Sequence, residues 1–400
     1  MGIVKVTDNI FWVGAVDWNV KSFHGHTYTT KRGTTYNAYL IVDEKIALVD
    51  TVYGPFTNEM IEKIEEVIGS VSRIDYVISN HVETDHSGGM PGLMARIPKV
   101  PVYCTQKGKE GLYKNYYGNW DYKIVKSGDE LKLGKNTCVF LEAPMIHWPD
   151  SMFTYVKEQQ VLLPNDAFGQ HIATSERFDD EVDMHFVMEE ATKYYANILW
   201  PLNSLISKKL DEVTKMNIGI KIIGPSHGII WRKDPGKIVK FYSDCSNSRV
   251  TVDNKVVIAY ETMWNSTELI AKSIAEGLVS EGMSVKLYNI PVSDMTEVIA
   301  ECFTAKGILF GSSTHDNEML PNIAMFIHML KGLRPKGKYA GCFGSMGWAG
   351  GAVKDMQETL AKSGLEFVIE PVSCKFVPDK EETKKCIEFG KSFAKILKSK

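Results

Sequence analysis

The sequence lacks several features that mark special classes of protein. Its cysteines are scattered and include no C-x-x-C pair, which argues against a disulfide framework, a Cys-rich zinc site and an iron-sulfur cluster. The net charge of -3 provides no basic excess to neutralise a phosphate backbone, which argues against a nucleic-acid partner. The segment from Met1 to Phe11 lacks the continuous apolar stretch of a signal peptide or a membrane span. We therefore expect a cytoplasmic protein with no membrane partner.

The length of the chain indicates two domains. Its 400 residues are enough to build two hydrophobic cores. A polar segment from Ser243 to Asn254 separates two regions with different patterns. We predict one domain over residues 1–250 and a second over residues 251–400.

The two regions differ in their hydrophobic periodicity. Upstream, strand-length apolar runs and one helical segment are found at Ala38–Val42, Ile46–Val49, Glu59–Ile68, Ile74–Ile78 and Val161–Leu163. Downstream, strands and helices alternate at Val256–Tyr260, Ser266–Ser280, Ser284–Asn289, Gly307–Phe310, Tyr339–Phe343, Glu366–Val372 and Glu381–Leu397. The downstream alternation predicts an α/β fold with an open parallel sheet.

A cluster of metal-capable side chains follows the predicted strand Ile74–Ile78. The sequence His81-Val82-Glu83-Thr84-Asp85-His86 places four possible ligands within six residues. In an extended loop, alternation would send His81, Glu83 and Asp85 to one side, while His86 turns with the glycines that follow. One segment of this kind can serve two metals, and a cluster of this size is more than polar loop surface.

Three later residues are candidates to complete two coordination shells. They are His147 in Pro-Met-Ile-His-Trp-Pro, Asp166 in Pro-Asn-Asp-Ala-Phe, and His227 in Pro-Ser-His-Gly. Each follows a strand-like run or lies beside a tight turn. Any one of them taken alone could be a buried or turn residue with a structural role, but their common placement at strand ends favours a shared site.

Three loops of the downstream region suit a phosphate and a planar ring. Each follows a predicted strand, so all three fall at the carboxyl edge of one sheet, where open α/β sheets bind ligands. The first loop opens a helix whose N-terminus favours an anion, although Ser and Thr at such a position are more often simple caps. The candidates are Thr262, Met263, Trp264, Asn265, Ser266 and Thr267; Ser312, Ser313, Thr314, His315, Asp316 and Asn317; and Gly344, Ser345, Met346, Gly347, Trp348, Ala349 and Gly350.

Taken together, these motifs resemble the flavodiiron proteins. The spaced set H-x-E-x-D-H, His, Asp and His resembles the metallo-β-lactamase fold, in which the hydrolytic branch usually has His where this chain has Glu83. A carboxylate is a harder donor than imidazole and favours iron over zinc. The three downstream loops resemble flavodoxin. The resemblance implies an N-terminal metallo-β-lactamase-like αββα domain followed by a flavodoxin-like doubly wound sheet.

The resemblance also implies how the metals and the flavin are held. One iron would be bound by His81, Glu83, His147 and a bridging Asp166, and the other by Asp85, His86, Asp166 and His227. FMN would place its phosphate in the first loop and its ring between the second and third, with Trp348 stacking on it.

Some positions depart from ordinary flavodoxins, and others have both a functional and a structural explanation. Trp264-Asn265 replaces the usual Thr-Gly pair, as in flavodiiron proteins, and Asp316 stands where Asn is common, which leaves the flavin potential open. His24 and Tyr195 resemble family residues that line the substrate pocket, although ordinary packing explains them as well. The remaining histidines are expected to be structural, with His171 the least certain because it follows Asp166 closely; they are His26, His171, His185 and His328.

The function implied by the resemblance is reduction of O2 to water, of NO to N2O, or of both. No rubredoxin-like extension follows, so we expect an external electron donor such as rubredoxin or a reduced deazaflavin. The family also implies a head-to-tail homodimer or a dimer of dimers. Two other readings remain open at this point: a dizinc hydrolase with an appended flavodoxin domain, and a flavodoxin-like electron carrier with a docking module. Glu83 and the presence of both sites in one chain favour the oxidoreductase.

Overall fold

The computed structural model describes residues 2–400 and divides into two compact units. Unit 1 contains residues 2–194 and 202–247, and unit 2 contains residues 195–201 and 248–400. The polar segment expected to separate the domains is short in the structure, because helix α7 extends to Ser246 and strand β17 begins at Val252. Among residues 2–400, no helix is both long enough and apolar enough to cross a membrane.

Unit 1 is built on two β-sheets that pack face to face. The first has the order β1-β2-β7-β8-β9-β10-β11 and the second the order β12-β13-β14-β15-β16. Strands β8 to β11 of the first sheet are parallel, whereas β12 to β15 are antiparallel. The strands are β1 Val4–Lys5, β2 Ile10–Trp12, β7 Tyr39–Val42, β8 Ile46–Val49, β9 Tyr76–Ile78, β10 Val102–Cys104, β11 Tyr122–Ile124, β12 Glu130–Lys132, β13 Thr137–Glu142, β14 Met152–Val156, β15 Val161–Leu163 and β16 Ile222–Ile223.

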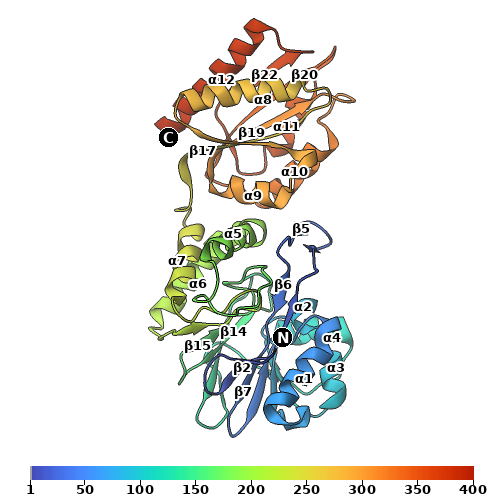
Figure 1. The fold of residues 1–400 in the computed structure, drawn as a ribbon, viewed down its shortest axis with the longest axis vertical. Coiled ribbons are helices and arrows are strands. Elements are labelled where there is room, and N and C mark those ends of the chain that lie inside the picture. Colours follow the sequence, from blue (N-terminus) through green and yellow to red (C-terminus); the bar gives the residue numbers. More distant parts are fainter. Residues whose placement is uncertain (1) are drawn as a thin grey trace. The chain divides into compact units, whose positions relative to one another are not determined.

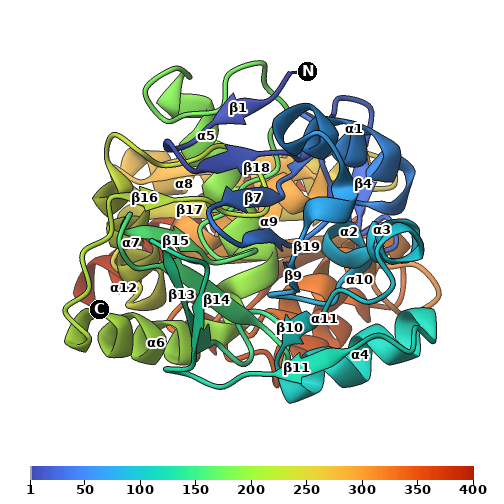
Figure 2. The same ribbon diagram turned by 90° about the horizontal axis from the view of Figure 1, so that it is seen from below.

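Helices cover the outer faces of both sheets. Helices α1, α3 and α4 gather on one side of unit 1 in two views (Figures 1 and 2), and their apolar faces form one core cluster with the first sheet. A second core cluster lies between the sheets and includes Tyr39, Ile78, Phe140 and Leu163. The helices of unit 1 are α1 Thr57–Ile68, α2 Thr84–Ser87, α3 Met90–Arg96, α4 Gln106–Tyr116, α5 Met184–Tyr194, α6 Asn203–Lys215 and α7 Pro235–Ser246.

Two short hairpins complete unit 1 and contribute to its site. Strand β3 (Ala15–Asp17) pairs with β6 (Thr34–Tyr36), and β4 (Ser22–Phe23) pairs with β5 (Tyr28–Thr29). The tip of the second hairpin contains His24, whose φ of +48° lies in the left-handed region beside Gly25 at +62°. This tight turn fixes the direction of the His24 side chain.

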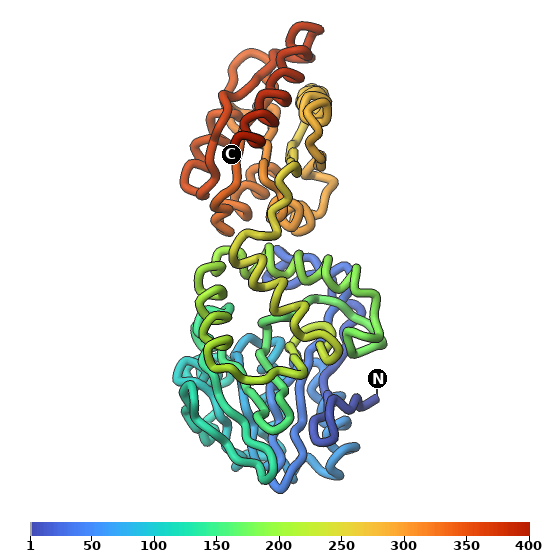
Figure 3. Tube along the Cα trace, turned by 90° about the vertical axis from the view of Figure 1, so that its left-hand side faces the viewer, coloured from blue at the N-terminus to red at the C-terminus, as the bar shows by residue number. Residues whose placement is uncertain are grey.

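Unit 2 is a parallel α/β sheet with the strand order of flavodoxin-like folds, 2-1-3-4-5. The sheet order is β18-β17-β19-β20-β21, and β22 also pairs with β20. Figure 3 traces this unit from yellow at β17 to red at α12. The elements are β17 Val252–Glu261, α8 Ser266–Ser280, β18 Ser284–Asn289, α9 Met295–Thr304, β19 Ala305–Ser313, α10 Pro321–Gly332, β20 Tyr339–Met346, α11 Ala352–Leu360, β21 Glu366–Phe367, β22 Val372–Lys375 and α12 Lys380–Ser399.

Two features of unit 2 show how local sequence sets its packing. The strand expected at Glu366–Val372 is divided into β21 and β22, because Pro371 has no N–H to donate to the ladder. Helices α8 and α12 lie close together (Figure 1) because each has a glycine at the contact. A Cβ on Gly277 would lie 2.0 Å from the Ile387 carbonyl oxygen, and one on Gly390 would lie 2.2 Å from that of Ile274.

Candidate metal centre and cofactor cavity

The His-rich segment changes conformation halfway along its length. Strand β9 ends at Ile78, Glu83 still has a non-helical backbone with ψ of 143°, and Thr84–Ser87 forms the single helical turn α2. The expected alternation, with His81, Glu83 and Asp85 on one side, is therefore wrong. Successive side chains on a helix are rotated by about 100°, so Asp85 and His86 leave the direction shared by His81 and Glu83.

All seven predicted ligands lie in two adjacent groups. Donor atoms of His81, Glu83, His147 and Asp166 lie within 4.8 Å of one another, and so do donor atoms of Asp85, His86 and His227. The ligands come from the loop after β9 with helix α2, the loop between β13 and β14, the turn after β15 and the turn after β16. The two groups have the composition that the resemblance implies.

Asp166 lies between the two groups. Its Oδ2 is 3.0 Å from His147 Nε2 and 3.6 Å from His81 Nε2. Its Oδ1 is 3.0 Å from His86 Nε2 and 3.5 Å from His227 Nε2. One carboxylate therefore presents a different oxygen to each group, which is the arrangement expected of a bridging ligand.

The charges of the cluster stabilise one another. Burial alone would raise the pKa of Asp166, but His86 and His147 hold it well below its usual range. Burial likewise opposes ionisation of Glu83, yet hydrogen bonds from His24 and His81 lower its pKa. Burial lowers the pKa of His86, but the charges of Asp85 and Asp166 outweigh burial and raise this pKa to about 9. Glu83 and Asp166 are thus ionised at neutral pH, the form that binds a metal.

Three supporting contacts were not expected from the sequence. Asp150 Oδ2 lies 2.9 Å from His81 Nδ1, and the Thr35 carbonyl oxygen lies 2.7 Å from His227 Nδ1. Each contact engages one ring nitrogen and leaves Nε2 directed at the cluster. Asp50 accepts hydrogen bonds from the Asn80 backbone at 2.7 Å and the Asn165 side chain at 3.1 Å, and so joins the residues just before His81 and Asp166. The sequence offers only one hint of these contacts, the acid Asp150 three residues after His147, and this spacing alone does not predict the contact with His81.

The donor set fits two iron ions. It consists of imidazole and carboxylate with no thiolate, a combination that suits non-haem iron. Within residues 2–400, the buried atoms Asp85 Oδ1 and His86 Nε2 have no hydrogen-bond partner. The 3.0 Å approach of His86 Nε2 to Asp166 Oδ1 also lacks hydrogen-bond geometry. Buried polar atoms left without hydrogen bonds are costly, and a cation shared by Asp85, His86 and Asp166 would offset that cost.

Of the two predicted pocket residues, His24 lies beside Glu83 in unit 1, whereas Tyr195 belongs to unit 2. His24 Nε2 lies 3.4 Å from Glu83 Oε1 at the partly exposed side of the cluster, and this contact raises the pKa of His24. Tyr195 is buried in unit 2, with its ring 5.5 Å from that of Phe303. The neighbouring Tyr194 belongs to unit 1, and its ring lies 5.3 Å from that of His171.

The other histidines fall into two classes. His26, His185 and His328 are exposed. His171 is buried, its Nδ1 lies 2.9 Å from the Thr34 hydroxyl, and its ring lies 4.5 Å from that of His227. Burial and the nearby His227 lower the pKa of His171, so this ring is neutral. His171 therefore lines the metal centre without belonging to either ligand group.

The three predicted cofactor loops meet at the carboxyl edge of the unit 2 sheet. The Thr267 hydroxyl lies 2.9 Å from that of Ser313 and 2.8 Å from that of Ser345, so one residue from each loop joins a single hydrogen-bonded group. The Met263 backbone N–H donates to the Ser313 hydroxyl at 3.2 Å. These contacts fix the loops relative to one another.

The loops enclose a cavity of about 540 Å³. Phe376 and Val377, which follow β22, also line it and were missed because no motif marks them. Seven of the 19 predicted residues do not line it: Thr262, Asn265, Thr267, Ser312, His315, Gly344 and Gly350. The 12 that do are Met263, Trp264, Ser266, Ser313, Thr314, Asp316, Asn317, Ser345, Met346, Gly347, Trp348 and Ala349.

The cavity fits FMN. Asn265, at the N-cap of α8, has a φ of +67° and makes no side-chain cap, so the first backbone N–H groups of the helix are left for an anion. Within the part of the chain that is described, the buried Thr262 hydroxyl has no hydrogen-bond partner. Trp264 and Trp348 are 84% and 89% exposed at the edge of the cavity, where a planar ring would cover them.

Comparison with known proteins agrees with both sites. The ODP family beta lactamase profile matches residues 34–228, and the flavodoxin profile matches residues 258–390. The chain is 51% identical to a nitric oxide reductase of Moorella thermoacetica, over 98% of each protein. Its structure matches rubredoxin oxygen:oxidoreductase from the anaerobe Desulfovibrio gigas with a TM-score of 0.96 at 36% identity, over 99% of both chains.

A further match is the flavodiiron protein of Giardia intestinalis, with a TM-score of 0.95 at 32% identity, over 100% of this chain and 97% of that one. These relatives favour neither the dizinc hydrolase nor the simple electron carrier. Two ligand groups joined by one carboxylate, a flavodoxin-like cavity and end-to-end similarity agree: the chain belongs to the flavodiiron protein family.

Proposed function

We propose that this protein is an oxidoreductase that reduces nitric oxide, dioxygen or both, with electrons from an external donor. The proposal rests on the position of Asp166, whose two oxygens face two separate groups of candidate ligands. Such a carboxylate would hold two metals near each other, and both could then act on one diatomic molecule. The names of the relatives, a nitric oxide reductase and a rubredoxin oxygen:oxidoreductase, support the same chemistry.

The protein's own residues prepare the site for that chemistry. Asp150 and the Thr35 carbonyl orient His81 and His227, and Asp50 ties together the loops that carry His81 and Asp166. When bound, FMN would take up electrons from the donor, and the two irons would hold the gas and deliver electrons to it. Buried side chains around His81, His86 and Asp166 keep bulk water from these three ligands.

Protons are the second requirement of the reaction. His24 is a suitable donor, because its side chain is 33% exposed and its Nε2 lies 3.4 Å from Glu83. Glu83 raises the pKa of His24, which favours the protonated ring. We assign the tyrosine role to Tyr194 in place of Tyr195, because Tyr194 contacts His171 beside the cluster while Tyr195 packs on Phe303.

The test is steady-state turnover of NO and of O2 with one chemical or protein donor, using protein that contains two irons and one FMN per chain. We expect turnover of at least one gas. Loaded protein that reduces neither gas would contradict the proposal. The ratio of the two rates then identifies the preferred substrate.

We further propose a head-to-tail homodimer, or a dimer of dimers, that receives electrons from rubredoxin or a reduced deazaflavin. Trp148 near the ligands and Trp348 at the flavin cavity are both exposed and suit a partner surface. Subunits with Asp85→Ala and His86→Ala, mixed with subunits with Thr262→Ala and Thr267→Ala, should regain activity as heterodimers. Verified heterodimers that stay inactive would exclude electron transfer between subunits.

We also propose that the protein works in the cytoplasm. All seven cysteines are buried free thiols, a state that a reducing compartment maintains. Fractionation of cells that produce the native protein tests this, and recovery outside the cytoplasmic fraction would contradict it.

A further inference from the structure

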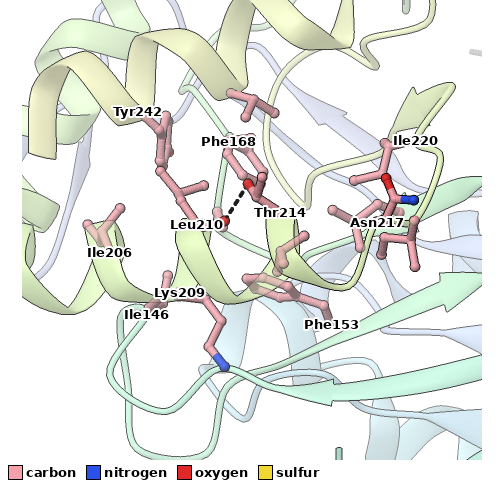
Figure 4. Close-up of a pocket in the computed structure, with 15 residues that line it drawn as sticks. Ile146, Phe153, Phe168, Ile206, Lys209, Leu210, Thr214, Asn217, Ile220 and Tyr242 are labelled. Atoms are coloured by element: carbon pink, nitrogen blue, oxygen red, sulfur yellow. Dashed lines mark hydrogen bonds between the residues drawn. The ribbon is translucent and has the colours of Figure 1, made fainter. Parts of the chain in front are cut away.

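A second cavity lies in unit 1, between the β12–β16 sheet and helices α6 and α7 (Figure 4). Its volume is about 290 Å³. Twelve of its 15 lining residues are hydrophobic or aromatic, and the polar ones are Lys209, Thr214 and Asn217. It is separate from the flavin cavity and shares no predicted site residue with it.

The inner end of the cavity adjoins the metal ligands. Ile146 precedes His147, while Ala167 and Phe168 follow Asp166, and all three wall residues are buried. The cavity wall and the ligand loops are therefore the same stretches of chain. Asp166, which faces both ligand groups, directly precedes the wall residues Ala167 and Phe168.

Phe168 is held as part of this wall. Its φ of +69° lies in the left-handed region, which is unfavourable for a bulky residue. Its ring packs 4.6 Å from that of Tyr242, and its carbonyl oxygen accepts from Gln170 at 3.2 Å. These contacts keep the Phe168 ring at the edge of the cavity, so the space remains open.

The outer end reaches the surface of α6, where the polar groups are turned away from the interior. Lys209 Nζ donates to the Glu142 carbonyl oxygen at 2.8 Å and to Glu212 at 2.6 Å. The Thr214 hydroxyl donates to the Leu210 carbonyl oxygen at 2.7 Å, as the dashed line in Figure 4 shows. Thr214 and Asn217 are exposed at this end. The interior thus offers few polar groups, and apolar cavities of about 150 Å³ are known to bind xenon.

We propose that this cavity binds the substrate gas, an uncharged diatomic molecule, and supplies it to the metal centre past the wall formed by Ile146, Ala167 and Phe168. The inference rests on the proposed function. Such molecules form weak hydrogen bonds and lose little on leaving water for an apolar wall, whereas ions and strongly hydrated solutes lose much more.

Xenon tests binding without requiring turnover. Holoenzyme crystals pressurised with xenon should contain the atom between Phe153, Leu210 and Phe168. Val213→Trp, on the cavity side of α6, should exclude it. Ser204→Trp places the same side chain at an exposed position of the same helix outside the lining, and should leave xenon bound. If Val213→Trp does not fold, Val213→Phe makes the same test with a smaller side chain. A wild-type cavity with no xenon, or one filled by a co-purified acyl chain, would overturn the proposal.

Rapid-mixing kinetics tests whether the cavity supplies the gas to the metal centre. In rapid mixing of the reduced holoenzyme with NO or O2, the second-order rate constant should fall threefold or more in Val213→Trp and stay unchanged in Ser204→Trp. Iron content, FMN content and the rate at saturating gas should not change. If the wild type binds xenon but both variants have the same rate constant, the cavity is a passive void. That result would overturn the proposal that it supplies gas to the metal centre. A wild type that binds xenon and reduces neither gas would contradict the proposed function instead, and leave the binding site standing.

Discussion

The metal centre and the flavin cavity solve different binding problems. Most of the candidate metal ligands are buried, and further contacts orient the rings of His81 and His227. The flavin loops present hydroxyls, backbone N–H groups and two tryptophans that are largely exposed. A small cation needs several charged or polar ligands close together, and burying them costs free energy. That cost is tolerable only because the carboxylates, the imidazoles and the cation attract one another. A large cofactor supplies its own apolar surface, so its site needs fewer fixed charges.

The two sites also draw on the chain differently. The metal ligands come from four separate places between His81 and His227. The flavin loops follow neighbouring parallel strands, β17, β19 and β20, so the sheet alone brings them together. We therefore expect substitutions at the metal centre to be costly and local to unit 1, and substitutions at the flavin site to be milder and local to unit 2.

The largest expected effect is that of Asp166→Ala. It removes the one carboxylate that faces both ligand groups and leaves the four histidines around it without a shared anion. We expect iron affinity to fall by more than about 100-fold, beyond the effect of losing an outer partner. FMN content should stay normal. Metal analysis and the flavin absorbance of one sample measure both, with the exposed Asp211→Ala as control. Two irons retained in Asp166→Ala would refute the bridging role.

The second prediction concerns the pH dependence of the metal-free protein. The folded state raises the pKa of His86 to about 9 because Asp85 and Asp166 outweigh burial, whereas an unfolded histidine titrates near 6.5. The stabilisation is therefore complete below about pH 6.5 and is lost as pH rises through about 9, on the order of 3 kcal/mol.

Urea unfolding of metal-free protein at several pH values between those limits measures this effect. We expect wild type to lose stability across the range and His86→Gln to show a flatter profile. The same slope in both proteins would mean that another group carries the charge.

The third prediction is a weaker metal centre in Asp150→Asn. The substitution keeps the shape of the side chain but removes the charge that lies 2.9 Å from His81 Nδ1. Loss of such a partner weakens metal binding by about 10- to 100-fold. Competition with a chelator measures the affinity, and FMN binding in the same protein is the control. Wild-type affinity would show that the ring is oriented by the ligand group alone.

The smallest predicted effect is in unit 2. Thr267→Val removes the hydroxyl shared by Ser313 and Ser345. Loss of a buried hydrogen-bonding group costs about 1–2 kcal/mol, which corresponds to roughly 5- to 30-fold weaker FMN binding. Fluorescence titration of the apoprotein measures it, with Ser280→Ala at the far end of α8 as the matched control. Iron content that fell together with FMN would contradict the separation of the two sites.

Local sequence was sufficient for much of the fold. Strands β8, β15 and β18 and helix α8 have the predicted bounds, because apolar runs between turn residues and helical periodicity depend on neighbouring residues only. The prediction of one strand over Glu366–Val372 was wrong, although Pro371 in the sequence already indicates a break in the strand ladder.

The sequence by itself determined which residue types stand at the strand ends: the seven metal-ligand candidates, Glu83 in place of histidine, and the three flavin loops. Only the tertiary structure decided which of these side chains lie together and which other residues hold them. The turn of α2 sends Asp85 and His86 away from His81 and Glu83, Asp150 and Asp50 reach the ligand loops, and Tyr194 rather than Tyr195 lies beside His171. The physical reason is that side-chain direction depends on the local backbone dihedral angles and on partners distant in sequence, neither of which hydrophobic periodicity encodes.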